Sequence, residues 1–138
     1  MQGSKWAAIV DRAVLVLAIA VESGRRHDLP PARASLASLH VPKTARAATF
    51  AADGAFDDRS FRGDIESLGF TPDLPRNPRK TGGPKHKGFV PGCWVVECKH
   101  AHLVILRAIR TRWYRQLGSF EAFLATAASH CIVRAARF

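Results

Sequence analysis

The stretch from Pro75 to Gly92 constrains the fold of this chain more than any other part of the sequence. Four prolines and four glycines fall within its 18 positions, and all five of its charged residues are Lys or Arg. Proline removes a backbone donor and glycine weakens any helix or strand, so regular structure cannot continue through this stretch. The sequence therefore predicts a long basic loop over residues 75–92, and such loops in compact domains are usually functional or disordered.

Two apolar stretches lie close together at the start of the chain. Lys5–Asp11 is followed by Val14–Glu22, which contains three valines and an isoleucine. Because β-branched residues favour strands and the connection is short, we expect an antiparallel pair. Residues 23–27 then form a turn.

A helix and a strand are expected next. Asp28 can cap a helix that tolerates proline in its first turn and runs over about residues 32–39. Residues 47–53 form a short apolar stretch that ends at Asp53 and is followed by Gly54, which indicates a strand and its exit turn.

A second helix and strand lead up to the basic loop. Asp57 or Asp58 can cap a helix that ends at Gly69, the residue type favoured just beyond a helix C-terminus. Residues 70–74 predict an edge strand, because Pro72 cannot donate a hydrogen bond to a central position in a sheet.

Helical periodicity returns after the loop. The apolar face expected of the first helix is Trp94, Cys98, Ala101, Ile105, Ile109 and Trp113. Gly118 is expected to break this helix and Ser119 to cap the next. The face expected of that helix is Phe120, Phe123, Leu124, Ala127, Cys131 and Ile132. Together these elements predict an α/β fold in a single domain over residues 1–138.

The charge balance favours polyanions as partners. The chain carries 21 Lys and Arg against 11 Asp and Glu, a net charge of +10, so nucleic acid is the first expected partner and an acidic membrane the second. Hydrophobic residues make up 47% of the chain, which excludes disorder for most of it.

Neither a membrane span nor a secreted scaffold is expected. The longest apolar run, residues 13–21, is about half of the ~20 residues that cross a bilayer, and it lacks the flanks of a signal peptide. The three cysteines are an odd number without the spacing of a disulfide framework. We expect a cytoplasmic protein in a reducing compartment that has no membrane partner.

Two acids are the candidate chemical groups. Asp53 ends a strand before a glycine turn, where α/β sheets hold ligands; its alternative role is to form the turn. Glu97 lies near the start of a long helix inside an apolar stretch; its alternative role is a favourable charge near a helix N-terminus. Converging carboxylates with phosphate suit Mg²⁺.

Around these acids the sequence resembles the insertion-sequence DDE transposases. AADGAFDD at residues 51–58 is similar to the A-D-x-[GA]-[YF]-[DS] segment around their second acidic residue. CWVVECKHAHL at residues 93–103 is similar to the W-V-V-E-R-x-F-A-W-L helix that carries their third. The segments at residues 5–28, 69–80 and 112–124 also resemble family segments in the same order, so the resemblance covers nearly the whole chain.

The resemblance implies an RNase H-like catalytic domain, with a mixed sheet flanked by helices. In that family three carboxylates hold two metal ions, which activate water or a 3′-hydroxyl for attack on DNA phosphodiesters. By matching position, Asp53 is the second carboxylate and Glu97 the third, with Mg²⁺ as the cofactor of the intact enzyme.

The first carboxylate of the family lies on a strand that would precede Lys5. The resemblance therefore implies the C-terminal part of a transposase without its first strand: a second-frame product, an internal-start product or a remnant of a mobile element. Asp11 is a substitute acid, but the matching family residue is not a metal ligand, and a turn role is the stronger interpretation. The sheet edge left by a missing strand is expected to favour self-association.

Four residues on the glutamate helix depart from the family pattern. Cys93 and Cys98 stand where the family places cations, and His100 and His102 where it places Phe and Trp. Their C-x₄-C-x-H-x-H spacing matches no structural zinc site, because residues 98 and 100 point different ways on a helix.

The basic residues form two groups of candidate DNA contacts, in the loop and after the glutamate. The set is Arg76, Arg79, Lys80, Lys85, Lys87, Arg107 and Arg110, with Arg112, Arg115, Trp113 and Tyr114 near the second group. The alternative for any single cation is a solvated surface position, and the alternative for the aromatic residues near the second group is packing.

Two functions are expected. The first is a transposase fragment that is inactive alone and whose partners are DNA and the upstream transposase half or the full-length transposase. The second is a non-catalytic basic module that binds DNA or inhibits full-length transposase.

Overall fold

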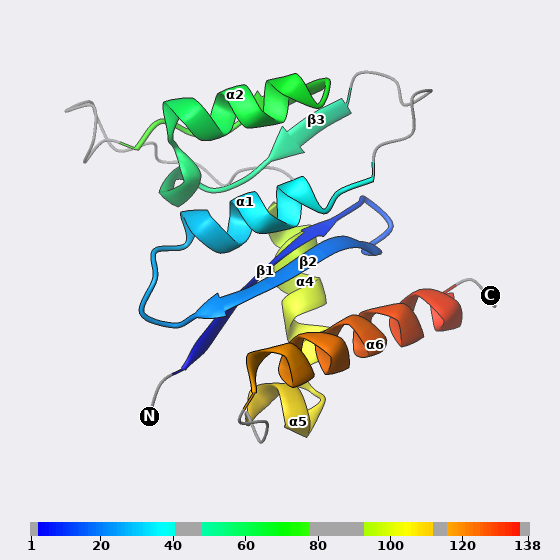
Figure 1. Cartoon of the computed structure of the whole chain (residues 1–138). Helices are drawn as coiled ribbons and strands as arrows, with labels where there is room; N and C mark the ends of the chain where they lie inside the picture. The colour runs from blue at the N-terminus through cyan, green and yellow to red at the C-terminus, as the bar shows by residue number, and fades with distance from the viewer. Residues whose placement is uncertain (1–2, 41–47, 78–92, 112–115, 136–138) are drawn as a thin grey trace. The chain divides into compact units, whose positions relative to one another are not determined.

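A computed structural model describes residues 3–40, 48–77, 93–111 and 116–135. The chain separates into two compact units, which are described one at a time: unit 1 is residues 1–39 with 95–138, and unit 2 is residues 40–94. The elements are β1 (Ser4–Val10), β2 (Val16–Ser23), α1 (Leu29–Ala37), β3 (Ala48–Ala51), η1 (Gly54–Phe56), α2 (Arg59–Ser67), β4 (Phe70–Asp73), α4 (Cys93–Val104), α5 (Arg107–Arg110) and α6 (Leu117–Ala135) (Figure 1).

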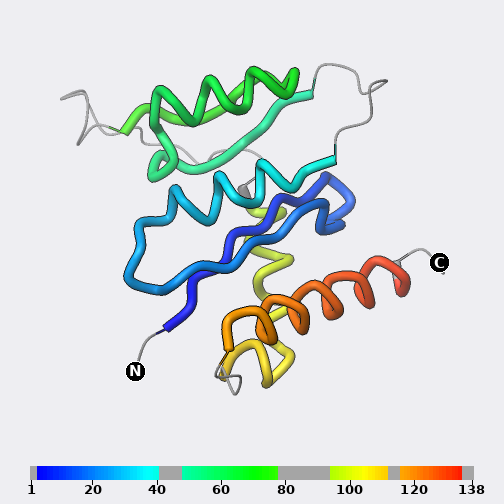
Figure 2. The backbone as a smooth tube through the Cα atoms, in the orientation of Figure 1, coloured from blue at the N-terminus to red at the C-terminus, as the bar shows by residue number. Residues whose placement is uncertain are grey.

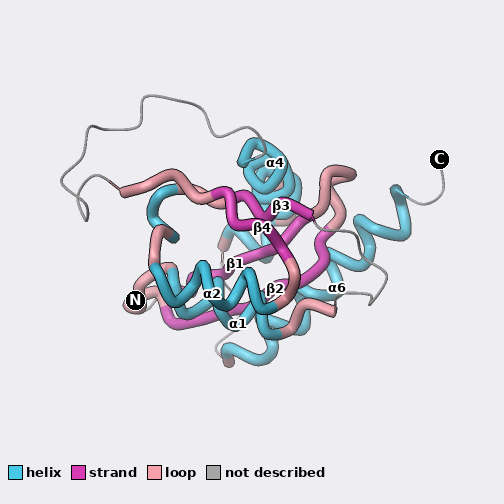
Figure 3. The backbone as a smooth tube through the Cα atoms, turned by 90° about the horizontal axis from the view of Figure 1, so that it is seen from above, coloured by secondary structure: helices cyan, strands magenta, loops and turns pink. Residues whose placement is uncertain are grey.

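The fold is mixed α/β, as expected. Its described residues form two separate two-stranded sheets, with β1 beside β2 and β3 beside β4, together with five α-helices (Figure 3). In the described part of the chain, no helix combines the length and the apolar character needed to cross a bilayer.

The β1–β2 hairpin confirms the expected antiparallel pair (Figure 2). Ser4 lies opposite Ser23 and Ala7 opposite Ala20, and the register shifts between Ile9 and Val10. In the turn, Val14 has a positive φ of 62°, which is rare for a β-branched residue.

One face of the hairpin is lined by small residues. Ala7 lies opposite Ala20, and Ala18 is two residues before Ala20 on β2, so the three alanines lie on the same face. Helix α1 packs on both strands, and its fully buried Ser35 donates a 2.7 Å hydrogen bond from Oγ to the carbonyl oxygen of Ala7. The alanines allow this close approach.

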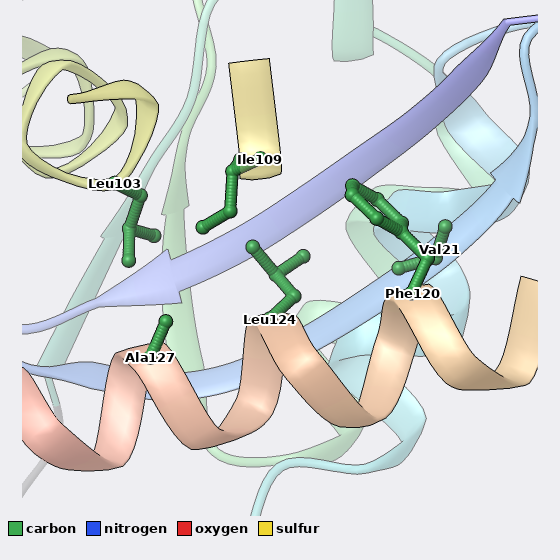
Figure 4. Close-up of a cluster of buried hydrophobic side chains, with 6 residues drawn as sticks. All are labelled: Val21, Leu103, Ile109, Phe120, Leu124 and Ala127. Atoms are coloured by element: carbon green, nitrogen blue, oxygen red, sulfur yellow. The ribbon is translucent and has the colours of Figure 1, made fainter. Parts of the chain in front are cut away.

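The core of unit 1 joins β2 to the C-terminal helices. Its buried residues are Val21, Leu103, Ile109, Phe120, Leu124 and Ala127, and Figure 4 shows their side chains turned toward one another. Leu103 and Leu124 are fully buried, so α4 and α6 are fixed to the hairpin through large aliphatic contacts.

Unit 2 is a short β-α-β arrangement. Strand β3 pairs in parallel with β4, from Ala48 opposite Phe70 to Ala51 opposite Asp73, and α2 connects them (Figure 3). Asp58 caps α2 by accepting the N–H of Phe61 at 3.0 Å, and Gly69 follows the helix with a φ of 84°. Both residues confirm the helix signals in the sequence.

Residues 78–92 of the predicted basic loop lie outside the described residues. The helices that follow them differ from the expectation. Helix α4 ends at Val104, and α5 is a separate short helix. The buried face of α4 is Val95, Lys99 and Leu103, whereas Trp94 is 48% exposed and Ile105 76% exposed. Apolar residues lie on several sides of α4, so their spacing in the sequence did not identify the side that becomes buried.

The start of α6 corrects a further expectation. Gly118 and Ser119 lie inside this helix, which begins at Leu117, so neither breaks nor caps it. Burial of Phe120 and Leu124 offsets the roughly 1 kcal/mol cost of glycine in a helix.

Asp28 takes the expected N-cap position of α1, but α1 begins at Leu29, earlier than predicted. Its carboxylate accepts no hydrogen bond from the helix. It instead forms a 2.8 Å ion pair with Lys5 on β1.

Candidate functional site

Asp53 lies at the carboxyl end of the parallel pair in unit 2. It follows β3 and caps η1, where its Oδ1 accepts the backbone N–H of Ala55 at 2.6 Å. The residue is exposed. Asp53 therefore has the turn-forming role that its sequence position also allowed. Its second carboxylate oxygen makes no hydrogen bond within the described residues.

A partly buried ion pair lies close to Asp53 in the chain. Nε and Nη2 of Arg62 donate to Oδ1 of Asp57 at 3.1 and 2.7 Å, and Nη2 also donates to the carbonyl oxygen of Leu74 at 2.6 Å. Oδ2 of Asp57 accepts the N–H of Asn77 at 2.8 Å. The pair therefore attaches α2 to the segment in which the basic loop begins.

Gly54 places that same segment close to the turn at Asp53. A Cβ added at Gly54 would lie 3.3 Å from the carbonyl oxygen of Pro75, closer than most side-chain contacts. The backbone N–H of Ala52 also donates to the carbonyl oxygen of Asp73 at 3.2 Å. The Asp53 turn and the exit of β4 are therefore in direct contact.

Asp73 is an acid that the sequence reasoning missed. It is the last residue of β4 and is exposed, at the same carboxyl edge of the parallel pair that Asp53 follows. The sequence contained the information needed to find it. Asp73 lies near the end of the strand predicted over residues 70–74, and an acid at the end of a strand in an α/β sheet is a candidate for the same reason as Asp53.

Glu97 lies on α4 in unit 1 and is exposed. It forms no hydrogen bond or ion pair with another described residue. The burial cost expected for it inside an apolar stretch does not arise, because α4 turns Val95, Lys99 and Leu103 inward instead. Asp53 and Glu97 belong to different units, so each is placed only within its own.

Asp11 stabilises the hairpin turn. Its Oδ1 accepts the N–H of Leu15 at 2.8 Å, and its own N–H donates to the carbonyl oxygen of Leu15 at 3.0 Å. These bonds agree with the turn interpretation of this acid.

The described candidate DNA contacts are accessible. Arg76, in the stretch predicted to be a basic loop, and Arg107 and Arg110 on α5 are exposed, and none has an ion-pair partner in the described ranges. Arg79, Lys80, Lys85 and Lys87 lie outside the described residues, as do Arg112, Trp113, Tyr114 and Arg115.

Carboxylate oxygens are the donors that Mg²⁺ prefers, so the chemistry of Asp53 and Glu97 fits this ion. Over residues 3–40, 48–77, 93–111 and 116–135, no group of three His, Cys, Asp or Glu side chains comes close enough to hold a metal. His100, one of the four residues considered for zinc, stacks on Trp6.

Comparisons of the chain with protein-family models, with curated proteins and with solved structures found no match.

Proposed function

We propose that this chain is the C-terminal part of an RNase H-like DDE transposase, which binds DNA but does not cut it alone. The observation that carries the proposal is the position of Asp53. This acid is exposed at the carboxyl end of a parallel strand pair, and it lies in the segment that resembles the transposase motif.

The order of the elements supports the same assignment. A strand pair, a helix, a strand, a helix, a strand and then helices follow one another, and Glu97 is on the helix that comes after the last strand. In an intact enzyme, Asp53 and Glu97 would bind Mg²⁺, which supplies Lewis-acid stabilisation of the phosphate. The upstream half of the transposase would supply the first carboxylate.

DNA binding in this proposal depends on exposed cations. Arg76, Arg107 and Arg110 can neutralise phosphates, and each phosphate contact adds about 0.9 to the salt dependence of binding. The test is fluorescence anisotropy of the full chain with a labelled duplex across a salt series. We expect binding at low salt that weakens steeply as salt is added.

A matched pair of variants separates specific contacts from general charge. The Arg107→Gln/Arg110→Gln variant should lower the salt slope by roughly 2, because two phosphate contacts are lost. The Arg25→Gln/Arg26→Gln variant removes the same charge from the turn after β2 and should leave the slope almost unchanged. Equal effects of the two variants would mean that net charge alone attracts DNA.

A nicking assay with Mg²⁺ tests the catalytic part of the proposal. The chain alone should leave supercoiled plasmid intact. Mg²⁺-dependent nicking that disappears in Asp53→Ala would contradict the proposal and return Asp11 to the list of ligands. A chain that fails to bind DNA at low salt would remove both the fragment and the binding module.

The second candidate function is a non-catalytic binding module or an inhibitor of full-length transposase. The turn bonds of Asp11 are compatible with it, as they are with the first candidate, because both leave this acid without a catalytic role. If this function is correct, adding the chain to a transposition assay should lower the activity of the full-length enzyme, and Asp53→Ala should inhibit equally well.

A further inference from the structure

One edge of strand β1 is joined to no other described strand, because β1 pairs with β2 alone within the described residues. All seven residues of β1 are partly exposed. Strand β2, by contrast, has four buried residues, Val16, Ala18, Ala20 and Val21. The side chains of the hairpin are therefore more deeply buried along β2 than along β1.

The backbone groups that point to this edge follow from the register. The N–H of Gly24 donates to the carbonyl oxygen of Gly3 at 2.7 Å, which makes these two residues a hydrogen-bonded pair. Such pairs alternate along an antiparallel ladder, so Lys5, Ala7 and Ile9 direct their backbone groups toward β2. Ser4, Trp6 and Ala8 direct theirs away.

This edge has little of the usual protection against pairing. Proteins block free edges with charged side chains such as Lys, with proline, with bulges or with very short strands. Lys5 is the one charged residue of β1. Strand β1 is seven residues long and contains no proline, and its irregularity is confined to the last step, between Ile9 and Val10. Its sequence, SKWAAIV, includes three residues that favour strands, Trp6, Ile9 and Val10.

We propose that β1 pairs antiparallel with β1 of a second copy of this chain, about a twofold axis at Ala8. This register joins the outward backbone groups of the two strands. It sets Trp6 opposite Val10 of the second copy, and Lys5 opposite Asp11 of the second copy. The two neighbouring registers that also join the outward backbone groups set Lys5 opposite Ile9 or Ala7 of the second copy. Of these three registers, the one centred on Ala8 alone pairs opposite charges.

The present partners of Lys5 and Asp11 permit this exchange. Lys5 holds Asp28 in an ion pair whose side chains are 40% and 58% exposed, and such pairs add little to stability. Asp11 uses Oδ1 to accept the Leu15 N–H, which leaves Oδ2 for a cation. Lys5 and Asp11 lie at non-hydrogen-bonded positions, where facing side chains are closest.

The test is the mass of the full chain by light scattering or sedimentation over a wide concentration range. Moderate salt screens the repulsion between two copies that each carry +10. We expect the mass to rise from 15.1 kDa to twice that value as concentration increases. A wild-type chain that stays monomeric at every concentration overturns the proposal. The proposal is equally overturned if the edge of β1 binds a strand of another polypeptide and the chain does not dimerise.

Substitutions at Ala8 test the edge. Ala8→Pro removes an N–H that faces away from β2, so the hairpin keeps its own hydrogen bonds. The dimer loses both hydrogen bonds of its central Ala8–Ala8 pair, because each copy carries the substitution. We expect a monomer with unchanged far-UV circular dichroism. Ala8→Val keeps the N–H and should remain dimeric. A dimer that survives in Ala8→Pro would assign association to another surface.

Substitutions of the charges test the register. Lys5→Glu replaces two attractive contacts with two repulsive ones and should weaken dimerisation roughly ten-fold. Asp28→Ala removes the same ion pair within each chain but keeps Lys5, so dimerisation should be unaffected. If Lys5→Glu and Asp28→Ala behave alike, the register centred on Ala8 is wrong.

Discussion

The imidazole of His100 lies flat against the indole of Trp6, with ring centroids 3.9 Å apart and planes inclined by 11°. This stack joins α4 to β1 inside unit 1. The contact is therefore made by an aromatic ring that can titrate.

The stack predicts that unit 1 loses stability in acid. Burial lowers the pKa of His100 below its ordinary value of 6.5. The unfolded chain therefore binds more protons than the folded chain as the pH falls from 6.5 toward the folded pKa, and the free energy of unfolding decreases over that range. Above 6.5 both states are neutral at this group, so its effect disappears.

Denaturant unfolding on both sides of this pH measures the effect. His100→Phe keeps an aromatic ring against Trp6 and should reduce the loss of stability in acid. His102→Phe changes an exposed residue on the same helix and should leave the pH dependence as in the wild type. Identical pH profiles for wild type and His100→Phe would contradict the prediction.

The Arg62–Asp57 pair should contribute far more stability than the Lys5–Asp28 pair. The two have nearly equal lengths, 2.7 and 2.8 Å, but Asp57 is 12% exposed and Asp28 is 58% exposed. Arg62→Ala strands a nearly buried carboxylate and removes the bond to Leu74, so we expect it to lower the free energy of unfolding by about 2 kcal/mol.

Lys5→Ala serves as the comparison and should cost about 0.5 kcal/mol or less. Both variants are measured by denaturant unfolding at a concentration where the wild type is monomeric. Equal costs for the two would mean that the burial of Asp57 does not determine the strength of its ion pair.

Leu124 should be among the most sensitive core positions. Its side chain on α6 is fully buried in the core of unit 1, whereas Leu117 on the same helix is 38% exposed. Leu124→Ala should destabilise the chain by about 2–5 kcal/mol, because the site cannot fully collapse around the cavity. Leu117→Ala should cost roughly 0.5 kcal/mol. Thermal or denaturant unfolding of both variants tests the contrast.

Local signals in the sequence located most of unit 2 and the hairpin. Asp58 and Gly69 are residue types that act within one helical turn, and each occupies its expected place at an end of α2. The strands of the hairpin followed from β-branched residues close in sequence. Such features need no information from distant parts of the chain.

Features that depend on tertiary contacts were not predictable in the same way. The sequence does not reveal that α4 buries Lys99 and exposes Trp94, since that choice depends on which side of the helix faces β1 and α6. Nor does it reveal that Asp57 binds Arg62 and Asn77, because the partner Asn77 is distant in sequence. The position of Asp53 was predictable because a strand end and a glycine turn are local.

The left-handed backbone at Val14 gives this chain a simple route to higher stability. A β-branched residue with a φ of 62° is strained, and Val14→Gly should release about 1 kcal/mol. Val14 is not one of the residues proposed to bind Mg²⁺, and it lies outside β1, the strand proposed to form the dimer. The Val14→Gly chain is therefore a suitable background in which costlier variants, such as Leu124→Ala, remain folded long enough for their DNA binding and assembly to be compared.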